Sequence, residues 1–195
     1  MAARLPAPER RSQLLAVAIE VFAEHGFHDT SMNEVAEAAG VTKPVLYQHF
    51  RSKKALYREL LDDVSTRLED AIAKATAEAG TPRQQVNAGF RTYFRFFTAH
   101  RAAFTVLFGG GTTRDGEFAD AARRVEDAIA EAITPLIAVQ GLPAADRRLL
   151  AHGIVGLTEG TSRHWAANGY QPDADELAAR VAELAWAGLR GVSPT

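Results

Sequence analysis

Apolar residues recur along this chain every three or four positions, which is the spacing of one face of an α-helix. In the first such segment, Leu14, Ala18 and Phe22 fall on one face, and Gly26 follows as a residue that favours a helix end. No convincing run alternates between apolar and polar residues as a half-buried strand would. The pattern therefore predicts an all-α fold.

Residues that favour helix ends divide the chain into roughly nine helices. Ser31 and Glu34 can form a capping box, in which each side chain bonds to the other residue's backbone N–H. Pro44 suits the first turn of a helix, and Pro135 is expected to bend the last turns of a later one. Gly109-Gly110-Gly111 is expected to be a flexible break. After the first helix, the expected segments cover residues 31–40, 42–50, 52–78, 81–100, 102–108, 117–139, 145–168 and 173–191.

The two short helices of residues 31–50, joined by a tight turn, are the most informative part of the pattern. Leu46 and Phe50 share one face of the second helix, whereas Pro44 and Gln48 share the opposite face. One side of this helix is therefore expected in the core, and the other is free to enter a groove. This arrangement is typical of a helix-turn-helix whose second helix lies in the DNA major groove.

The distribution of charge supports a nucleic-acid partner, although the net charge of the whole chain does not. The formal net charge is -2, which does not by itself indicate such a partner. The span from residue 43 to residue 58 nevertheless contains no acid, and its basic residues are Lys43, Arg51, Lys53, Lys54 and Arg58. A basic stripe beside the second short helix is what phosphate contacts require. The alternative is a packed three-helix subdomain whose charges are merely solvated.

Three stretches of sequence carry a resemblance to a known family. They cover residues 24–36, 39–50 and 52–57. With them, the chain over about residues 9–60 resembles the DNA-binding domain of TetR-family repressors. The resemblance implies a homodimer that binds palindromic double-stranded operator DNA and responds to a small-molecule effector.

The same resemblance implies two domains. Residues 1–52 would form a three-helix helix-turn-helix domain, and residues 53–195 a helical ligand-binding and dimerisation domain. Sequence alone leaves open the operator, the regulated genes, and whether the effector releases or promotes DNA binding.

Family roles at the DNA carry over only where positions match. By the resemblance, Lys43 and Pro44 approach base edges, and Asn33 reaches toward a base from the preceding helix. Lys43 is a natural donor to guanine, and Gln48 has the side chain that reads adenine. Phosphate contacts are implied for Tyr47, His49 and Lys53, and backbone anchoring for Ser31 and Thr42. The alternatives are a packed tyrosine, a solvated lysine, and a histidine that caps its helix end.

Phenylalanines gather in the second domain, with six of the ten between residues 90 and 108. An ordinary core would explain any one of these rings, but as a group in a ligand-sensing domain they predict an elongated apolar pocket. Its expected lining is Phe90, Phe94, Phe97, Phe104, Leu107 and Phe108. Nearby Arg91, Arg95 and Arg101 either hold an anionic head group or form a solvated basic face.

Several short strings, including Arg4-Leu5-Pro6 and residues 185–189, are also similar to actinobacterial TetR-type regulators of fatty-acid synthesis, which respond to long-chain acyl-CoA. This resemblance implies a fatty acyl effector.

The last two expected helices are predicted to form the dimer interface. Three glycines on the first of them, at positions 153, 156 and 160, permit close helix approach. The expected interface residues are Gly153, Ile154, Leu157, Trp186 and Leu189. The alternative is that both helices complete the core of one protomer.

Other function classes find little support. The chain has no cysteine, so disulfides and cysteine-ligated metals are excluded, and we expect no cofactor or metal. No signal-peptide pattern or run of about 20 apolar residues is present, which predicts a cytoplasmic protein without membrane contact. We find no motif of a phosphate loop, serine hydrolase or zinc protease, so an enzyme is the weaker alternative. A helical carrier of a lipid-like ligand, without DNA binding, is the other.

Overall fold

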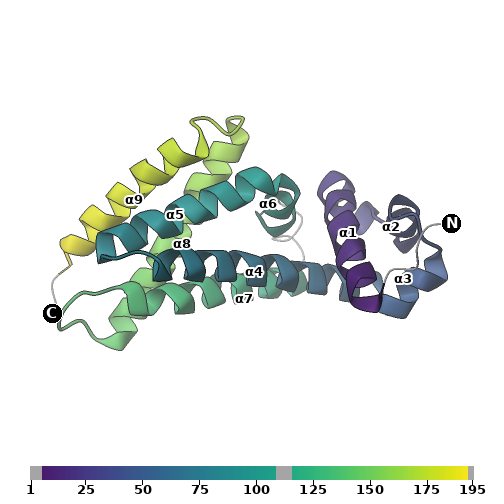
Figure 1. The fold of residues 1–195 in the computed structure, drawn as a ribbon, viewed down its shortest axis with the longest axis horizontal. Coiled ribbons are helices and arrows are strands. Elements are labelled where there is room, and N and C mark those ends of the chain that lie inside the picture. The colour runs from purple at the N-terminus through teal and green to yellow at the C-terminus, as the bar shows by residue number, and fades with distance from the viewer. Residues whose placement is uncertain (1–5, 109–115, 193–195) are drawn as a thin grey trace. The chain divides into compact units, whose positions relative to one another are not determined.

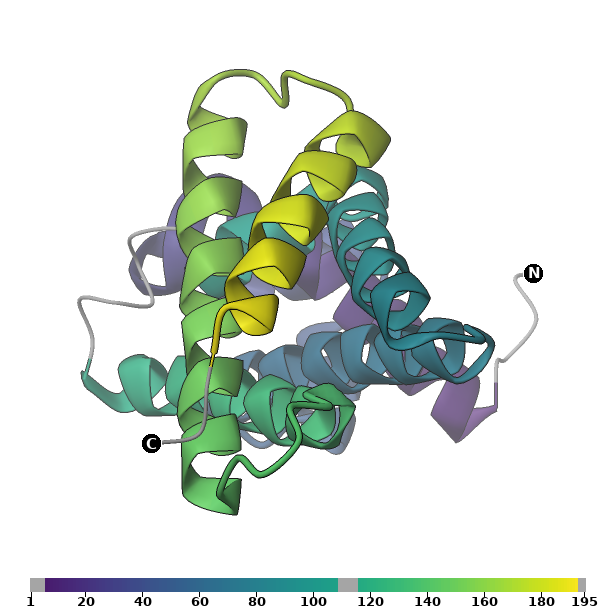
Figure 2. The same ribbon diagram turned by 90° about the vertical axis from the view of Figure 1, so that its left-hand side faces the viewer.

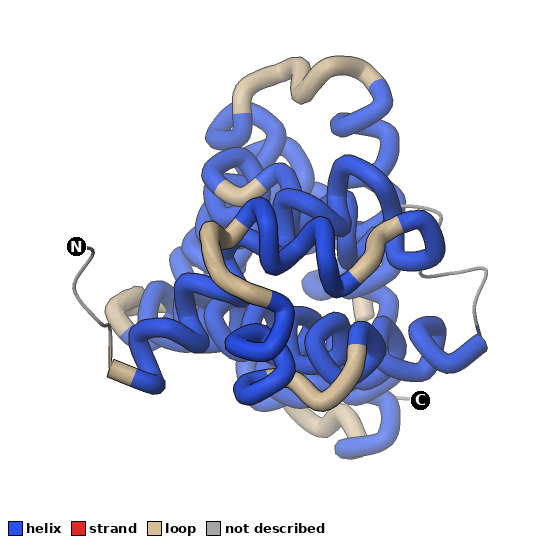
Figure 3. The backbone as a smooth tube through the Cα atoms, turned by 90° about the vertical axis from the view of Figure 1, so that its right-hand side faces the viewer, coloured by secondary structure: helices blue, strands red, loops and turns tan. Residues whose placement is uncertain are grey.

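The computed structural model describes residues 6–108 and 116–192, and only the backbone of residues 116–122. Every element in these ranges is helical, as Figures 1 and 3 show, so the all-α prediction is confirmed. A short 3₁₀ turn covers Thr134–Leu136. The α-helices are α1 (Ala7–Asp29), α2 (Met32–Ala38), α3 (Lys43–His49), α4 (Lys53–Ala77), α5 (Pro82–Ala99), α6 (Arg101–Phe108), α7 (Gly116–Ile133), α8 (Ala144–Ala167) and α9 (Ala174–Arg190).

The chain divides into two compact units. The first takes the described parts of residues 1–64 and 101–122, which include α1 to α3, the beginning of α4, α6 and the beginning of α7. The second takes those of residues 65–100 and 123–195, which include the rest of α4, α5, most of α7, α8 and α9. Helices α4 and α7 are each divided between the two units, α4 after residue 64 and α7 after residue 122. The functional boundary expected at residue 52 stays a prediction.

Helix α1 is interrupted at Gly26, whose φ of 78° and ψ of 170° are not helical. Glycine adopts a positive φ without the steric penalty that a Cβ brings. The helix end expected here is thus a sharp kink, after which one more turn runs to Asp29. Phe27 follows the kink directly and packs against both Phe22 and Tyr57, with ring centroids 6.1 and 5.0 Å away.

The predicted capping box begins α2. The Ser31 hydroxyl accepts a hydrogen bond from the Glu34 backbone N–H at 3.2 Å, and the Glu34 carboxylate accepts one from the Ser31 N–H at 2.6 Å. Val35 and Leu46 then join α2 to α3 through the core, where both are fully buried. The two short helices therefore pack as the apolar spacing predicts.

Helix α6 packs on α1 within the first unit. The Tyr57 hydroxyl donates a hydrogen bond to the carbonyl of Val106 at 3.3 Å, and the Tyr57 side chain is only 4% exposed. Its ring meets Phe22 edge-on, with centroids 5.0 Å apart. The phenol thus links α4 and α6 beside α1.

In the second unit, α5 packs along α9, and a loop joins α8 to α9, as Figure 2 shows. The buried Phe94 of α5 meets Trp165 of α8 edge-on at 5.6 Å. The indole Nε1–H of Trp165 donates to the carbonyl of Pro172 at 2.6 Å, which fastens the loop to α8. The Asp173 carboxylate then caps α9 by accepting from the N–H groups of Asp175 and Glu176.

One helix differs from its prediction. The segment expected to continue to Val139 leaves the α-helical conformation after Ile133, and the 3₁₀ turn that contains Pro135 follows. Proline has no N–H to bond to the carbonyl four residues earlier, and its ring clashes with that carbonyl. Pro135 therefore ends α7 rather than bending it. The expected break at residues 109–111 lies outside the described residues.

Candidate nucleic-acid interface and effector site

Helix α3 presents one open face. Lys43, Pro44, Tyr47 and Gln48 are exposed, with 44% of Tyr47 accessible, whereas Leu46 is fully buried. Among the described residues, no hydrogen bond or ion pair engages the Lys43, Tyr47 or Gln48 side chains. This face therefore carries a cation, a phenol and an amide that are available to a partner.

Three of the predicted DNA-binding residues lie at the starts of α2 and α3, and they differ in whether their side chains already form hydrogen bonds. The Ser31 hydroxyl is occupied by its capping bond to Glu34, and its N–H lowers the pKa of the Glu34 carboxyl by hydrogen bonding. Asn33 lies exposed in the first turn of α2. Thr42 is exposed and precedes α3 without forming a side-chain cap within the described residues.

His49 ends α3 and is half-buried. Its carbonyl accepts a hydrogen bond from Nη1 of Arg11 in α1 at 2.7 Å. The Arg11 guanidinium also lies 4.5 Å from the centre of the Phe50 ring and forms an ion pair with Glu59. Sequence reasoning missed Arg11, since no local motif connects residues that are so distant along the chain.

Lys53 lies where the sequence places it, at the first residue of α4, but its ammonium points into the protein. The Nζ donates to the carbonyls of Phe27, His28 and Thr30 at 2.6, 3.1 and 2.7 Å. It also lies 4.5 Å from the centre of the Phe27 ring. The phosphate contact expected of Lys53 stays a prediction, although its donors already have partners.

Comparisons with known proteins agree with this geometry. A family described as "Bacterial regulatory proteins, tetR family" matches residues 14–60, and a "Tetracyclin repressor-like, C-terminal domain" matches residues 82–188. The "HTH-type transcriptional activator FasR" of Mycolicibacterium smegmatis is 34% identical over 193 residues, covering 98% of this chain and 88% of that protein. The chain belongs to the TetR family. It is a helix-turn-helix DNA-binding transcriptional regulator.

Two solved structures resemble this TetR-family chain throughout. A "TetR-like transcriptional regulator from Rhodococcus sp. RHA1" is 30% identical, has a TM-score of 0.78, and covers 97% of this chain and 100% of its own. A "transcriptional regulator FadR from Bacillus subtilis in complex with stearoyl-CoA" has a TM-score of 0.80, covers 93% and 99% of the two chains, and is 19% identical. The second likeness concerns the fold alone.

The residues predicted to line an effector pocket occur in both units of this regulator. Phe90, Phe94 and Phe97 of α5 belong to the second unit and are buried. The α6 residues Phe104, Leu107 and Phe108 belong to the first unit, and the first two of these are buried. The single pocket expected from the whole set stays a prediction.

The hydroxyl of Tyr93 adds a polar group to the buried α5 stripe. Its oxygen lies 3.5 Å from the hydroxyl of Ser162, which itself donates to the Thr158 carbonyl at 2.7 Å. Burial strongly raises the pKa of Tyr93, so the phenol remains neutral and keeps its proton. The Tyr93 and Ser162 hydroxyls therefore place polar groups beside the buried rings of α5.

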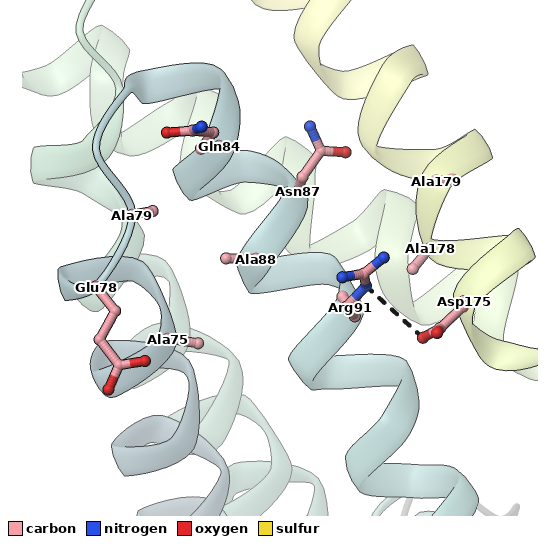
Figure 4. Close-up of a pocket in the computed structure, with 10 residues that line it drawn as sticks. All are labelled: Ala75, Glu78, Ala79, Gln84, Asn87, Ala88, Arg91, Asp175, Ala178 and Ala179. Atoms are coloured by element: carbon pink, nitrogen blue, oxygen red, sulfur yellow. Dashed lines mark ion pairs between the residues drawn. The ribbon is translucent and has the colours of Figure 1, made fainter.

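A cavity of about 390 Å³ opens elsewhere on the second unit, between α4, α5 and α9 (Figure 4). Much of its wall is alanine, and its polar residues include Gln84, Asn87 and Arg91. Arg91 points toward Asp175, with Nε and Oδ1 3.8 Å apart. Sequence reasoning missed this cavity, because scattered alanines on three helices give no local signal.

Part of the surface of α8 and α9, where the dimer interface was predicted, is exposed to solvent. A Cβ added at Gly153, Gly156 or Gly160 would meet no described atom within 4 Å, and the α9 side chain of Leu184 is 61% exposed. Ile154 and Leu189, by contrast, pack against the protomer's own cluster of Ala130, Ile137 and Ala151. Leu157 and Trp186 are half-buried. None of the described helices is apolar and long enough to cross a membrane.

Proposed function

We propose that this TetR-family regulator binds a palindromic operator as a homodimer, and that a long-chain acyl-CoA controls its DNA binding. The single observation that carries the DNA-binding part is the open face of α3. A recognition helix must bury one side in its own domain and leave hydrogen-bonding side chains for the groove. Helix α3 meets both conditions, because Leu46 is buried whereas Lys43, Tyr47 and Gln48 are exposed.

The proposed roles follow the chemistry of each side chain. Lys43 donates to guanine O6 and N7, Gln48 bonds to adenine, and Pro44 offers apolar contact to a base edge. Tyr47 donates its hydroxyl to a phosphate. Asn33 and Thr42 are exposed at the starts of α2 and α3, where backbone N–H groups also favour phosphates. His49, half-buried at the end of α3, contacts a further phosphate.

A dimer is proposed because one short helix reads few base pairs, while a two-fold pair reads a palindrome. Support comes from the α8 stripe of exposed glycines and from Leu149 and Leu184, whose side chains are 70% and 61% exposed. Large exposed leucines on neighbouring terminal helices favour a partner surface. The partner proposed here is a second copy of this chain.

The acyl-CoA effector is supported by the apolar stripe on α5 and by the FadR fold, which in that protein holds stearoyl-CoA. Phe90, Phe94 and Phe97 supply the kind of wall that an acyl chain needs. These rings are buried in the described state, so the effector would select a rearranged one. Helix α4 is continuous between the two units and would transmit the change.

Whether such a regulator activates or represses transcription depends on where its operator lies relative to the promoter, as well as on the protein. FasR is named an activator, whereas KstR2 of the same organism, 30% identical over 99 residues, is named a repressor. We propose repression, in which the dimer on its operator excludes the transcription machinery.

The deciding experiment selects sites from a random duplex pool with purified full-length protein. Enrichment of a palindrome with half-sites on one face of the duplex supports the operator-binding dimer. The selected duplex is then titrated with protein in the presence of stearoyl-CoA, free CoA or stearate. A change in affinity with stearoyl-CoA alone supports the effector class. Folded protein that enriches nothing at low salt, yet binds stearoyl-CoA, would instead support a lipid carrier.

A further inference from the structure

The phenol hydroxyl of Tyr93 is buried in the second unit without a hydrogen bond of ordinary length. Tyr93 is 6% exposed, and among the described residues its hydroxyl has one partner, the Ser162 hydroxyl, with the two oxygens 3.5 Å apart. Hydrogen bonds between hydroxyl oxygens are typically about 2.5 to 3.0 Å long. The Tyr93 oxygen therefore has at most a weak bond.

Ser162 does not improve this by donating to the phenol. It has one hydroxyl proton, which goes to the Thr158 carbonyl of its own helix at 2.7 Å. Thr158 likewise donates to the carbonyl of Ile154 at 2.7 Å. The proton left without an acceptor at bonding distance is thus the one on Tyr93.

The Tyr93 ring lies among the residues predicted to contact the effector. It meets Phe94 edge-on with ring centroids 5.3 Å apart, and it lies 4.9 Å from the centroid of Phe97. All three side chains are buried. The hydroxyl is therefore a polar donor in the same aromatic wall that we propose for the acyl chain.

A buried donor without an acceptor favours a ligand that provides one. Water bonds to the hydroxyl in the unfolded chain, and burial without a replacement costs free energy. A ligand with an acceptor at this point recovers that loss, whereas a purely hydrocarbon ligand does not. Sites of this kind select strongly between ligands that differ by one polar atom.

The charges around the phenol favour a neutral acceptor over an anion. After the larger effect of burial, the Glu159 and Glu126 carboxylates both raise the pKa of Tyr93. Arg163 opposes them, but it is ion-paired with Glu159. Glu126 is half-buried and has no ion pair among the residues that the structure describes. The carboxylate of a free fatty acid would be repelled here and would lose its hydration, whereas a carbonyl oxygen has no net charge.

We propose that Tyr93 donates a hydrogen bond to the carbonyl oxygen of a fatty acyl thioester bound in the second unit, and so distinguishes the thioester from the free fatty acid. The proposal rests on the proposed function, because it takes an acyl-CoA as the effector. Tyr93 is the specificity-determining residue, and Phe94 and Phe97 contact the hydrocarbon chain.

Two ligands that differ at one carbon test this contact. Stearoyl-CoA has the thioester carbonyl, and S-octadecyl-CoA is the thioether in which a CH₂ group replaces it. Isothermal titration calorimetry measures both dissociation constants for the full-length protein without DNA, below the concentration at which the ligands form micelles. We expect the wild type to bind the thioester roughly threefold to tenfold more tightly, which is the contribution of one neutral hydrogen bond.

Tyr93→Phe removes the hydroxyl and keeps the ring. It should bind the two ligands equally, because it loses affinity for the thioester alone. Tyr57→Phe is the matched control, since it removes another buried phenol hydroxyl, which belongs to the first unit and bonds to the Val106 carbonyl. The control should keep the wild-type preference, and circular dichroism shows that each variant is folded.

Unfolding without ligand separates this role from a structural one. If the hydroxyl stabilised the core, Tyr93→Phe would unfold at a lower urea concentration than the wild type, as Tyr57→Phe should. We expect the Tyr93→Phe midpoint to be unchanged or raised, because the substitution removes a donor that has no acceptor at bonding distance. A midpoint lowered as far as that of Tyr57→Phe would overturn the proposal.

The remaining outcomes are equally decisive. Equal affinity of the wild type for thioester and thioether would overturn the carbonyl contact, and this measurement needs no variant. A preference that survives in folded Tyr93→Phe would assign the carbonyl to another donor. Stearate bound as tightly as stearoyl-CoA would overturn the discrimination against the free acid. A wild type that binds none of the three ligands would refute the acyl effector itself, and operator selection reports separately on DNA binding.

Discussion

Arg95 of α5 holds both carboxylate oxygens of Asp175 of α9, with Nε–Oδ1 at 2.6 Å and Nη2–Oδ2 at 2.5 Å. This two-point contact lowers the pKa of the Asp175 carboxyl and raises that of Arg95. Both side chains remain about half exposed, so solvent screens the pair. Its main effect is to fix the start of α9 against α5.

Replacing Asp175 by asparagine should lower the unfolding temperature slightly at neutral pH. Because the folded carboxyl has a lowered pKa, its contribution is complete above the unfolded value near pH 3.9 and is lost as pH falls through the folded value. Thermal unfolding at a series of pH values should therefore show the two proteins converging toward acid. Glu183→Gln, which breaks the single-bond pair with Arg83, is the control and should have a smaller effect. A difference that persists in strong acid would contradict this account.

Tyr57→Phe should lower the free energy of unfolding by about 1 kcal/mol, because the hydrogen bond from the Tyr57 hydroxyl to the Val106 carbonyl is lost. Urea unfolding measures this change. Burial raises the pKa of Tyr57 to about 12. The stability that the neutral phenol contributes is therefore complete below about pH 10 and is lost as pH rises through 12. The variant should lack the phenolate absorbance step near pH 12, and an unchanged titration would argue against the buried hydroxyl.

Ser31→Ala should destabilise the first unit by about 1 kcal/mol, because the capping box leaves the Glu34 N–H without its acceptor. Chemical unfolding of the variant and of Ser31→Thr, which keeps the hydroxyl, makes the comparison direct. The pKa of Glu34 is lowered chiefly by the Ser31 backbone N–H, a bond that alanine retains. Equal stability of the alanine and threonine variants would count against the cap.

Leu184→Asp should dissociate the proposed dimer, because it introduces a charge on an exposed apolar side chain of α9. Analytical ultracentrifugation should show a monomer, and operator affinity should fall at least tenfold because two half-sites no longer bind together. Leu184→Met keeps the apolar volume and should remain dimeric. A fully dimeric aspartate variant would place the interface elsewhere.

Local signals explain what the sequence could predict about the fold. The Ser31–Glu34 capping box and the position of Pro44 are visible because their partners lie within one turn. The apolar spacing of Leu46 and Phe50 likewise predicts which face of α3 is buried. Pro135 shows the limit, because a proline can either bend a helix or end it, and the sequence does not decide between the two.

Non-local contacts explain what the sequence could not predict. The sequence predicts a phosphate contact for Lys53, and only the kinked end of α1 reveals its carbonyl partners. Arg11 reaches His49 across 38 positions, a separation that no motif encodes. The phenylalanines of α5 and α6 look like one cluster along the chain, yet they belong to different compact units.

The bond between Trp165 and the Pro172 carbonyl has a spectroscopic consequence. The chain contains two tryptophans, and Trp165 is 2% exposed while Trp186 of α9 is half-buried. The indole of Trp165 should emit at short wavelength, and that of Trp186 at longer wavelength. Replacing Trp165 by phenylalanine would leave Trp186 as the sole emitter, a label-free reporter placed by the fold on the helix where two copies are proposed to meet.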